Sequence, residues 1–441
     1  MMKKRILVVD DDPSLRALAR AVFPEEYEVQ EAVDGLDAWT IAQSWLPHLV
    51  ITDLMMPRMH GYELCVLLKG AGGVKGVKVI VTSAKPFATD KIQSLAAGAD
   101  AYVVKPFAVD DLLGKARKLL SQEEQAVPAA EPAASEAVPC EAAAPVPQVP
   151  DGRVLPVYVR FWGTRGSCPV SGEKYLKYGG NTACTEVRIG EIPLIIDCGT
   201  GLREFGMALQ RESGGKPVEG HIFVGHTHWD HIQGFPFFVP LYAPGNRFTV
   251  YSVHGAHGSL RDIFGDSMAL DYFPVPLSSL GSKLSFVELK GQVDVGVAKV
   301  KFQHLNHPGV CIGFGIETGG RKITYLSDHE TFGRASGENE GSRKQDAEIA
   351  MFARDSDLLI MEAQYTEAEY VARRGWGHST YDDVVRFAVD TGAKRLAVFH
   401  HDPEHTDDIL DKNLEYCREI VRRAGSGMEC FAARDGLRVD L

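Results

Sequence analysis

Residues 226–231 read His-Thr-His-Trp-Asp-His and carry three imidazoles and one carboxylate directly after the apolar run 222–225. Imidazole and carboxylate groups are ligands of transition metals. Side chains at i and i+2 of an extended segment point the same way, so His226 and His228 can bind one ion together. Asp230 and His231 follow at the turn and can face a second ion. The spacing predicts a metal centre rather than a polar loop that is rich in histidine by chance.

More candidate ligands come directly after segments that are apolar enough to be strands. His307 follows residues 298–304, Asp328 follows 322–326, and the pair His400-His401 follows 396–399. His378 lies just before a helix expected at 381–391, for which Ser379 or Thr380 would be the N-cap. Since several strands end in His or Asp, we expect these ligands to gather at one edge of a sandwich.

The segments between these residues supply the elements that would position them. Strand-like patterns lie at 157–162, 185–189, 194–197, 221–225, 248–253, 283–289, 298–304, 311–317, 322–326, 358–361 and 396–399. Helical patterns lie at 202–210, 346–354 and 381–391. Two sheets with helices outside fit this order. Residues 235–280 are less regular, and a lid and a plain surface insert are both compatible with them.

The metal motif and its distant partners resemble the metallo-β-lactamase fold in its two-metal hydrolase form. The segments 163–167, 179–182, 357–363 and 377–380 are similar to the ribonuclease Z and phosphodiesterase branch of that superfamily. The resemblance covers nearly all of residues 153–441 and implies an αββα sandwich. One departure is the lack of a clear Gly-Pro-rich arm of the kind that tRNA-processing members use. A small phosphodiester, such as a cyclic nucleotide, is therefore the expected substrate.

The resemblance also implies two metal ions, expected to be zinc, with manganese or iron left open by the ligand types. The first ion would be held by His226, His228 and His307. The second would be held by Asp230, His231 and His401, with Asp328 bridging the two ions. Counting from the strand favours His401 as the ligand and leaves His400 structural.

The chemistry implied is hydrolysis of a phosphodiester, for which two ions activate water and stabilise charge that develops on oxygen. Asp230 is expected to be a catalytic residue in addition to a metal ligand. His378 would protonate the leaving oxygen, and Glu362 would orient His378. Asp197 is expected to support the metal loop without binding metal. His304 and His329 are expected to be structural.

Acidic residues also follow predicted strands in residues 1–120, where strands alternate with helices. Strands are predicted at 5–10, 27–32, 49–52, 78–82 and 101–104, and helices at 15–23, 36–44, 62–69, 89–97 and 109–120. This order predicts a doubly wound, five-stranded parallel sheet. Asp10, Asp11 and Asp53 then lie at the carboxyl ends of strands, where such sheets carry their functional groups. Three carboxylates at one rim suit Mg²⁺.

The motifs of this segment resemble the receiver domain of two-component response regulators. They are residues 8–13 (Val-Val-Asp-Asp-Asp-Pro), 53–57 (Asp-Leu-Met-Met-Pro), Thr82 and 102–107 (Tyr-Val-Val-Lys-Pro-Phe). The resemblance implies phosphorylation of Asp53 by a histidine kinase or a phosphotransfer protein, with Mg²⁺ held by Asp10, Asp11 and Asp53. It also implies switching through Thr82 and Tyr102, with Lys105 in contact with the phosphoryl group.

Residues 121–152 are dominated by Ala, Pro and Glu and predict a semi-stiff linker between domains at 1–120 and 153–441. Such a spacer transmits no conformational signal by itself. Phosphorylation is therefore expected to act through domain docking or through self-association, for example as a homodimer.

The composition narrows the partners and the compartment. A net charge of −12 and a pI near 5.7 argue against a nucleic-acid partner, although a local basic groove stays open. The eight cysteines form no C-x-x-C pair, which argues against a disulfide framework and a thiolate zinc site. No stretch approaches the ~20 apolar residues that span a bilayer, so a cytoplasmic protein with no membrane partner is expected.

These observations predict a response regulator whose output is a metal-dependent phosphodiesterase controlled at Asp53. Two alternatives stay open. The first is a hydrolase of a thioester, lactone or lactam on the same fold, although Asp328 stands where many β-lactamases place cysteine. The second is a signalling scaffold in which the metal domain is structural or senses a ligand and does not catalyse a reaction.

Overall fold

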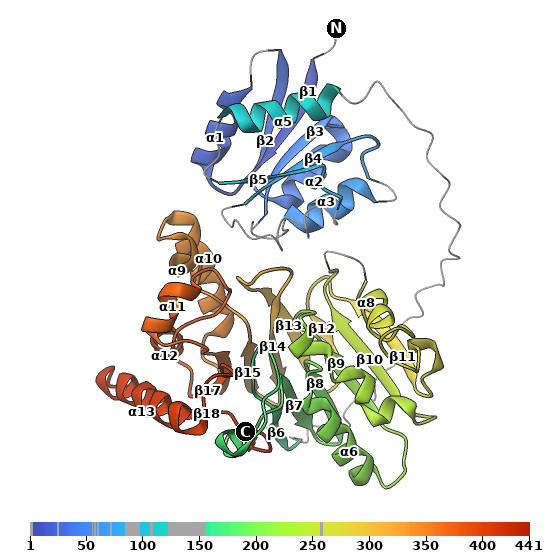
Figure 1. Cartoon of the computed structure of the whole chain (residues 1–441), viewed down its shortest axis with the longest axis vertical. Helices are drawn as coiled ribbons and strands as arrows, with labels where there is room; N and C mark the ends of the chain where they lie inside the picture. Colours follow the sequence, from blue (N-terminus) through green and yellow to red (C-terminus); the bar gives the residue numbers. More distant parts are fainter. Residues whose placement is uncertain are drawn as a thin grey trace. The chain divides into compact units, whose positions relative to one another are not determined.

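The structure, a computed structural model, describes residues 3–23, 26–54, 56, 59, 61–70, 73–83, 98–105, 109–121, 155–255 and 259–441. The chain divides into two compact units, Met1–Ala142 and Ala143–Leu441 (Figure 1). The predicted linker at 121–152 lies outside the described residues except for Ser121, so its bounds stay a prediction. The helix predicted at 89–97 also lies outside them.

The first unit is built on a parallel sheet with the strand order β2-β1-β3-β4-β5. Its strands are β1 (Lys4–Val9), β2 (Tyr27–Ala32), β3 (Leu49–Asp53), β4 (Lys78–Ser83) and β5 (Ala101–Val104). Its described helices are α1 (Pro13–Val22), α2 (Gly35–Trp45), α3 (Gly61–Lys69) and α5 (Val109–Ser121). The predicted five-stranded, doubly wound parallel sheet is confirmed.

Local sequence signals account for the start of α1 and for its place after β1. The Asp12 carboxylate accepts hydrogen bonds from the backbone N–H groups of Ser14 and Leu15, and Pro13 is the first helical residue. The strands bury continuous apolar runs, as expected for a sheet covered on both faces. The register pairs Asp53, the last residue of β3, with Thr82, which is followed by the last residue of β4, so both lie at the same rim of the sheet.

The second unit contains two seven-stranded mixed sheets. The first consists of β6 (Val157–Gly163), β7 (Cys184–Ile189), β8 (Ile192–Ile196), β9 (Glu219–Phe223), β10 (Arg247–Ser252), β11 (Lys283–Glu288) and β19 (Arg438–Asp440). The second consists of β12 (Val293–Asp294), β13 (Lys299–His304), β14 (Ile312–Thr318), β15 (Arg321–Leu326), β16 (Leu358–Glu362), β17 (Arg395–Phe399) and β18 (Glu429–Ala432).

Helices cover the outer faces of these sheets, as Figure 1 shows. On one side are α6 (Gly201–Ser213) and α8 (Leu260–Ser267), and on the other are α9 (Phe332–Ser336), α10 (Glu340–Ala353), α11 (Glu367–Arg373), α12 (Tyr381–Asp390) and α13 (Asp407–Arg423). The short helix α7 (Trp229–Ile232) lies within the metal motif. Apolar side chains of both sheets share one core, including Phe161, Phe223, Phe314 and Phe399. The predicted αββα sandwich is confirmed.

The sequence patterns gave no prediction for α13, β18 and β19. Helix α13 buries only Leu410, Cys417 and Val421, so its apolar stripe is narrow and most of its surface is polar. Strand β19 pairs antiparallel with β6, which lies almost 300 residues away in the chain. Such a short strand depends on its distant partner, and a local pattern does not reveal that partner.

Candidate metal centre and receiver acid site

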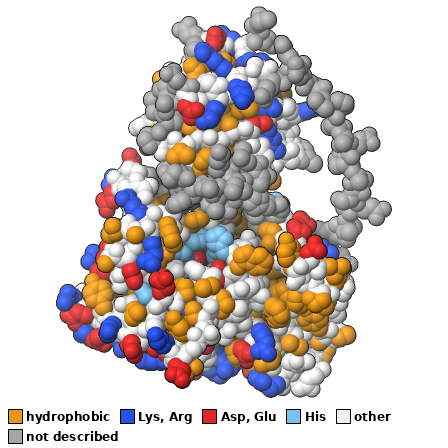
Figure 2. All heavy atoms as spheres, in the orientation of Figure 1, with side chains coloured by type: hydrophobic (Ala, Val, Ile, Leu, Met, Phe, Trp, Pro, Cys, Tyr) orange, Lys and Arg blue, Asp and Glu red, His pale blue; other side chains and the backbone are white. Residues whose placement is uncertain are grey.

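The ends of strands from both sheets deliver the candidate ligands of the second unit. His226 follows β9, His307 follows β13, Asp328 follows β15 and His400 follows β17. Strands β15, β16 and β17 run parallel, so their carboxyl ends meet at one edge. The four segments predicted to end in His or Asp are thus brought together at this edge. Figure 2 shows His side chains gathered at one place on the surface of this unit.

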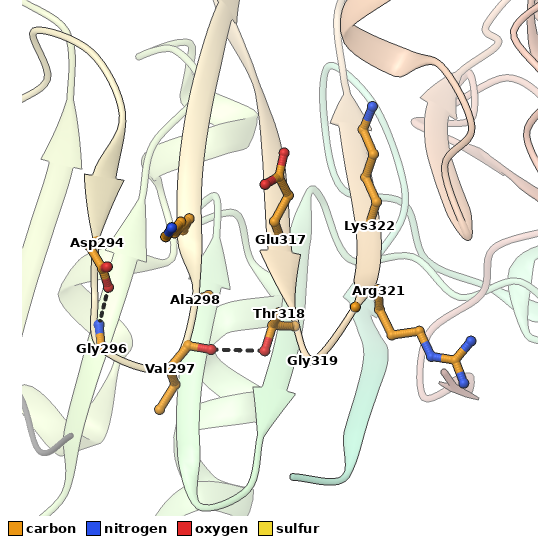
Figure 3. Close-up of a pocket in the computed structure, with 11 residues that line it drawn as sticks. Asp294, Gly296, Val297, Ala298, Glu317, Thr318, Gly319, Arg321 and Lys322 are labelled. Carbon is orange, nitrogen blue, oxygen red and sulfur yellow. Dashed lines mark hydrogen bonds between the residues drawn. The ribbon is translucent and has the colours of Figure 1, made fainter. Parts of the chain in front are cut away.

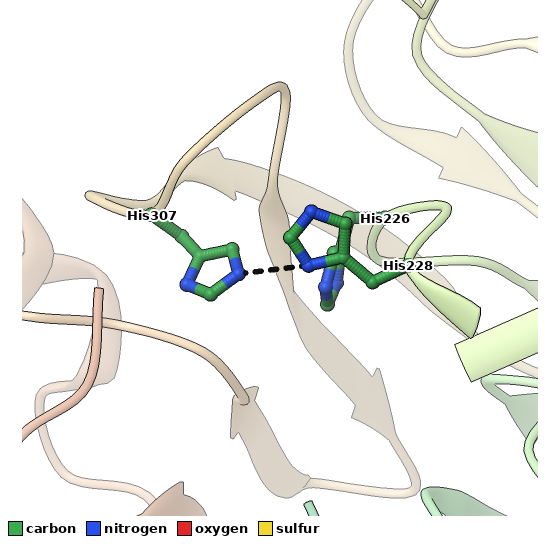
Figure 4. Close-up of side chains that lie close together, drawn as sticks. All are labelled: His226, His228 and His307. Carbon is green, nitrogen blue, oxygen red and sulfur yellow. Dashed lines mark hydrogen bonds between the residues drawn. The ribbon is translucent and has the colours of Figure 1, made fainter. Parts of the chain in front are cut away.

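The first group of ligands consists of His226, His228 and His307 (Figure 4). Nε2 of His307 lies 3.1 Å from Nδ1 of His228, and the ring centroids of His226 and His228 are 4.6 Å apart. Burial lowers the pKa of all three imidazoles, most strongly for His226 and His307. They are therefore neutral at pH 7, which is the form that binds a metal ion.

The second group consists of Asp230, His231, Asp328 and His400, which offer ligand atoms within 4.8 Å of one another. Nε2 of His400 lies 3.1 Å from Oδ2 of Asp230, and Nε2 of His231 lies 3.1 Å from Oδ2 of Asp328. All four side chains are buried. This set of nitrogen and oxygen atoms fits a transition metal better than Mg²⁺ or Ca²⁺.

Asp328 lies between the two groups. Its Oδ2 faces His231, while its Oδ1 lies 3.9 Å from Nε2 of His226, 3.8 Å from Nε2 of His307 and 3.3 Å from Nε2 of His400. The two oxygens of one carboxylate therefore face different imidazoles. This position is the one expected of the bridging residue.

The charges of the cluster fit a bound cation. Burial alone would lower the pKa of His231, but the carboxylates of Asp328, Asp230 and Asp197 outweigh it and hold this pKa well above its usual range. The buried Nε2 of His226 has no hydrogen-bond partner. Two features therefore fit a metal site whose donors converge. Nearby carboxylates favour a positive charge, and an imidazole nitrogen has no hydrogen-bond partner.

The structure corrects the preference for His401 over His400. Nε2 of His401 is hydrogen-bonded to the carbonyl oxygen of Ala433 at 2.9 Å, whereas His400 faces Asp230 and Asp328. The prediction assumed that side chains alternate beyond the end of β17. His400 has a φ of 55°, which ends the alternation and turns its ring into the cluster.

Positive φ recurs at residues that follow strands at this edge. Asp197 after β8 has a φ of 62°, and Asp328 after β15 has a φ of 60°. Residues other than glycine adopt this region only when the surroundings hold them there, and such strain concentrates at functional sites. With His400, three buried polar residues therefore leave three strands through the same sharp turn.

Asp197 supports the cluster from behind, in the way that was expected of it. Its Oδ2 lies 2.8 Å from Nδ1 of His231 and accepts a hydrogen bond of 2.7 Å from the hydroxyl of Tyr325. Its Oδ1 accepts from the backbone N–H of Gly225, at the start of the motif. A carboxylate on the far nitrogen of a ligand histidine fixes the tautomer of that ring.

His378 and Glu362 form a pair beside the cluster. Nδ1 of His378 lies 3.7 Å from Oε2 of Glu362 and 3.9 Å from Oδ1 of Asp328. Burial alone would lower the pKa of His378, but the Glu362 carboxylate outweighs it and raises this pKa. Oε1 of Glu362 accepts from the backbone N–H of Ser379 at 2.6 Å. Thr380 is the N-cap of α12, as one of the two predicted caps.

Sequence reasoning missed three contacts that position this cluster. The backbone N–H of Ser167 donates to Oδ2 of Asp230 at 2.7 Å. The buried Arg165 donates to the carbonyl oxygens of Asp402 and His405, which fixes the loop after β17. Gly166 lies so close to His400 that a Cβ there would meet Nδ1 at 2.4 Å. The Gly-Thr-Arg-Gly-Ser segment was noted for its resemblance, but no local pattern reveals these contacts.

The acid site of the first unit is centred on Lys105. Its Nζ lies 2.7 Å from Oδ2 of Asp10 and 2.5 Å from Oδ1 of Asp53. Burial and the nearby Asp53 raise the pKa of Asp10 to about 7 and that of Asp11 to about 6, despite Lys105. These carboxylates repel one another, and a divalent cation would relieve that repulsion. The predicted role of Asp10, Asp11 and Asp53 in Mg²⁺ binding stays a prediction.

The two predicted switch residues lie on the neighbouring strands β4 and β5. Thr82 lies one residue before the end of β4, pairs with Asp53 in the sheet, and donates from its hydroxyl to the carbonyl oxygen of Thr52 at 3.2 Å. Tyr102 lies in β5 with only 8% of its surface exposed. Residues 106 and 107, which belong to the resemblance, lie outside the described residues.

A cavity in the second unit is lined by the turns that join β12 to β13 and β14 to β15 (Figure 3). Its lining includes Asp294, Lys299, Glu317 and Arg321. Arg321 begins β15, whereas Asp328 follows the other end of that strand. The cavity is therefore at the opposite end of the sheet from the metal cluster and contributes none of its ligands.

Two family models match the chain. Residues 6–117 match the response regulator receiver domain, and residues 194–401 match the β-lactamase superfamily domain. The chain joins a response regulator receiver domain to a β-lactamase-fold domain. The matches agree with both resemblances that the motifs predicted. The second match begins within β8 and ends at His401, so it contains the whole metal cluster.

Similar proteins are known for each domain. The receiver domain is 40% identical over 120 residues to the response regulator MprA of Mycobacterium tuberculosis. This match covers 27% of the chain and 51% of MprA, so it spans about half the length of that relative. The human short-form tRNase Z is 21% identical, with a TM-score of 0.42, over 64% of this chain and 98% of that structure. A diphosphatase of the PhnP family is 18% identical, with a TM-score of 0.45, over 65% of this chain and 98% of that structure.

Within the described part of both domains, no helix is both long and apolar enough to cross a membrane. The expectation of a cytoplasmic protein stays a prediction.

Proposed function

We propose that the β-lactamase-fold domain is a metal-dependent phosphodiesterase and that the receiver domain controls it through Asp53. One observation supports this most strongly: two groups of His and Asp side chains adjoin each other, all of them buried except His228, with Asp328 facing both groups. Two zinc, manganese or iron ions held there would activate water and stabilise charge on the phosphoryl oxygens. A small diester, such as a cyclic nucleotide, is the proposed substrate.

The residues next to the cluster would handle the proton of the leaving group. The Glu362 carboxylate raises the pKa of His378 against the effect of burial, which favours the protonated form of this imidazole. The buried Glu362 faces Nδ1 of His378, and the backbone N–H groups of Ser379 and His329 hold the Glu362 carboxylate in place. His378 is therefore poised to donate a proton to a departing alkoxide, which is the task of a general acid.

Control through Asp53 requires a phosphodonor, and we propose a histidine kinase or a phosphotransfer protein as the partner. Lys105 lies within 2.5 Å of Asp53 and would neutralise part of the charge that a phosphoryl group adds. The composition of residues 121–152 predicts a spacer that transmits no conformational signal by itself, so we propose that phosphorylation acts through docking of the domains or self-association.

The test of the activity combines metal analysis with a substrate panel. The purified protein is expected to hold about two transition-metal ions per chain and to hydrolyse bis(p-nitrophenyl) phosphate or a cyclic nucleotide. Thioesters and lactones are assayed in parallel, because preferential turnover of these would favour the alternative hydrolase. A fully metallated protein that hydrolyses none of these compounds would be a scaffold, and the proposal would fail.

The test of the control uses beryllofluoride, which mimics the phosphoryl group on an aspartate. Hydrolysis and molecular mass are measured with and without it, in the presence of Mg²⁺. We expect the rate, the mass or both to change in the wild-type protein and neither to change in Asp53→Asn. If the wild-type protein shows neither change, the proposed control is wrong while the hydrolase assignment is unaffected.

A further inference from the structure

Trp376 is an exposed aromatic residue on the loop that leads directly into the metal cluster. The loop runs from Arg373, the last residue of α11, to His378. The indole of Trp376 is 53% exposed, although tryptophan is usually buried for most of its surface. Only Gly377 separates it from His378. More than half of the surface of this large side chain therefore faces solvent, two residues from His378.

A buried carboxylate braces this loop. Oε1 of Glu330 accepts from the backbone N–H of Gly375 at 2.8 Å, and Oε2 accepts from that of Gly377 at 2.9 Å. The hydroxyl of Tyr370 donates to the same Oε1 at 2.5 Å. Glu330 is only 1% exposed. The residues on both sides of Trp376 are therefore fixed to one internal group, which leaves the indole outside and its backbone held.

The brace also ties the loop to a candidate ligand. The carbonyl oxygen of Gly377 lies 2.9 Å from Nδ1 of His307, and Gly377 has a φ of 87°. A Cβ at this glycine would meet Nδ1 of His307 at 2.3 Å, so only glycine allows the loop to approach so closely. Gly377 is the only residue between Trp376 and His378, and its contacts with His307 and Glu330 hold it in place.

The cluster is open to solvent near aromatic and cationic side chains. His228 is the exposed member of the first ligand group, and the next residue, Trp229, is 64% exposed. The guanidinium of Arg373 lies over the ring of Tyr365 at 5.1 Å, and the Tyr365 ring lies 5.9 Å from that of His378. The Arg373 guanidinium also lies 3.5 Å from a carboxylate oxygen of Glu404, so its charge is partly paired, and a substrate at this opening would meet mainly the exposed indole rings.

We propose that Trp376 is a specificity residue that stacks on a flat ring of the substrate, most simply the base of a nucleotide diester. The inference rests on the proposed phosphodiesterase function and narrows its substrate class. Stacking of a base on an aromatic side chain is tolerant of base identity and favours substrates with a ring over those without one. Arg373 would lie near the phosphate side of the same substrate.

The experiment compares two diesters with the same leaving group in the metal-loaded, full-length protein. Thymidine 5′-(p-nitrophenyl) phosphate carries a base, and methyl p-nitrophenyl phosphate carries a methyl group in its place. The readout is the ratio of kcat/KM for the two substrates. Trp376→Ala is expected to lower this ratio by about tenfold, which corresponds to the loss of one base–aromatic stack.

Two control variants separate stacking from disturbance of the loop. Trp376→Phe keeps an aromatic ring and should retain most of the ratio. Val371→Ala removes another exposed side chain, on α11, and should leave the ratio at the wild-type value. Metal content is measured for each variant, since the loop contacts His307. A ratio that is unchanged in Trp376→Ala overturns the proposal, as does an equal loss in Trp376→Phe.

A second readout does not depend on turnover. Thymidine 5′-monophosphate should quench the tryptophan fluorescence of the wild-type protein, and Trp376→Ala should weaken its binding by a similar factor. If no diester is hydrolysed at all, the phosphodiesterase proposal fails, whereas hydrolysis without preference for the base refutes only the role of Trp376. A change in molecular mass in Trp376→Ala with an unchanged ratio would assign this surface to protein contacts and also refute the proposal.

Discussion

The receiver acid site and the metal cluster occupy corresponding places in their sheets but differ in donors and burial. Both lie where parallel strands end, which is where open α/β sheets place their functional groups. The receiver site has carboxylates on one lysine, with Lys105 within 2.7 Å of Asp10 and within 2.5 Å of Asp53. The cluster combines imidazoles and carboxylates from two sheets.

This difference in donors suits different tasks. Oxygen ligands alone suit Mg²⁺, which keeps several waters and exchanges readily. A buried set of nitrogen and oxygen ligands suits a transition metal that stays bound while substrates turn over. The ends of the strands therefore bring the side chains of each site together. The residue types decide whether the site can serve as a reversible switch or as a catalytic centre.

The largest effect is expected from substitution of Asp53, the proposed phosphoacceptor. Asp53→Asn should abolish phosphorylation of the full-length protein by a small-molecule phosphodonor, because an amide cannot form the acyl phosphate. Diester hydrolysis in the absence of a phosphodonor should be unchanged, because the cluster lies in the other unit. Phosphate incorporation is measured by mass spectrometry of the intact protein.

A matched control for this prediction lies in the same sheet. Asp100 also faces lysines, with Nζ of Lys69 at 2.6 Å, but its side chain is not at the acid rim. Asp100→Asn should keep phosphorylation. Incorporation that persists in Asp53→Asn would show that another residue accepts the phosphoryl group.

In the second unit, Asp328→Asn should produce the largest loss of hydrolysis. The carboxylate faces both ligand groups, so its loss should weaken both metal positions. Substitution of a residue that only supports a ligand typically lowers metal affinity or activity by about 10–100-fold. For Asp328→Asn we expect kcat/KM to fall by more than about 100-fold. Metal content by mass spectrometry and kcat/KM with a diester are measured on the same samples.

The same substitution elsewhere serves as the control. Asp346 is a carboxylate that accepts from the backbone N–H groups of Phe332 and Gly333 and does not face the cluster. Asp346→Asn should keep its metal and most of its activity. If Asp328→Asn retained two ions and full turnover, the bridging role would be wrong.

The sequence predicted the parts of these sites that local patterns encode. Residues 226–231 stood out because their ligands are neighbours in the chain, and Asp53 stood out because it ends an apolar strand. The five-stranded sheet and the αββα sandwich followed from the order of strands and helices. Periodicity gave most element positions to within a few residues, since central strands such as β8 and β16 bury continuous apolar runs.

The contacts that the sequence could not predict depend on backbone turns and on distant partners. The choice between His400 and His401 depended on one φ of 55°, which no residue type announces outside glycine. Glu330 braces Gly375 and Gly377 from a segment 45 residues away, and Arg165 fixes a loop more than 230 residues away. In the sequence, Glu330 is visible only as an acidic residue directly after Asp328 and His329, and this position does not indicate its hydrogen-bond partners.

A smaller effect is expected from the support behind the cluster. Asp197→Asn removes the charge beside Nδ1 of His231 while keeping the shape, and should weaken metal binding by about 10–100-fold. Tyr325→Phe removes only the hydroxyl that donates to Asp197 and should have a smaller effect of the same sign. Competition with a chromogenic chelator gives both affinities. Equal affinities in the wild-type protein and Asp197→Asn would show that the buried carboxylate only fills space.

The smallest expected effect concerns Asp435, a half-buried residue in the second unit that belongs to neither site. Burial raises its pKa to about 7, despite the hydrogen bonds that its Oδ2 accepts from the backbone and side-chain N–H groups of Asn181. The folded protein therefore holds a proton that the unfolded chain releases near the ordinary pKa of 3.8. Its contribution to stability is present below that value and is lost as the pH rises through about 7.

Asp435→Asn should remove this part of the pH dependence, because an amide does not titrate. The free energy of unfolding, measured with urea at pH 5 and pH 8 at saturating metal, should therefore fall less between these values in the variant than in the wild-type protein. Asp271→Asn, at an exposed position, should behave like the wild-type protein. The same fall in Asp435→Asn as in the wild-type protein would show that the Asp435 carboxylate does not take up a proton in this pH range, so that its environment does not raise its pKa.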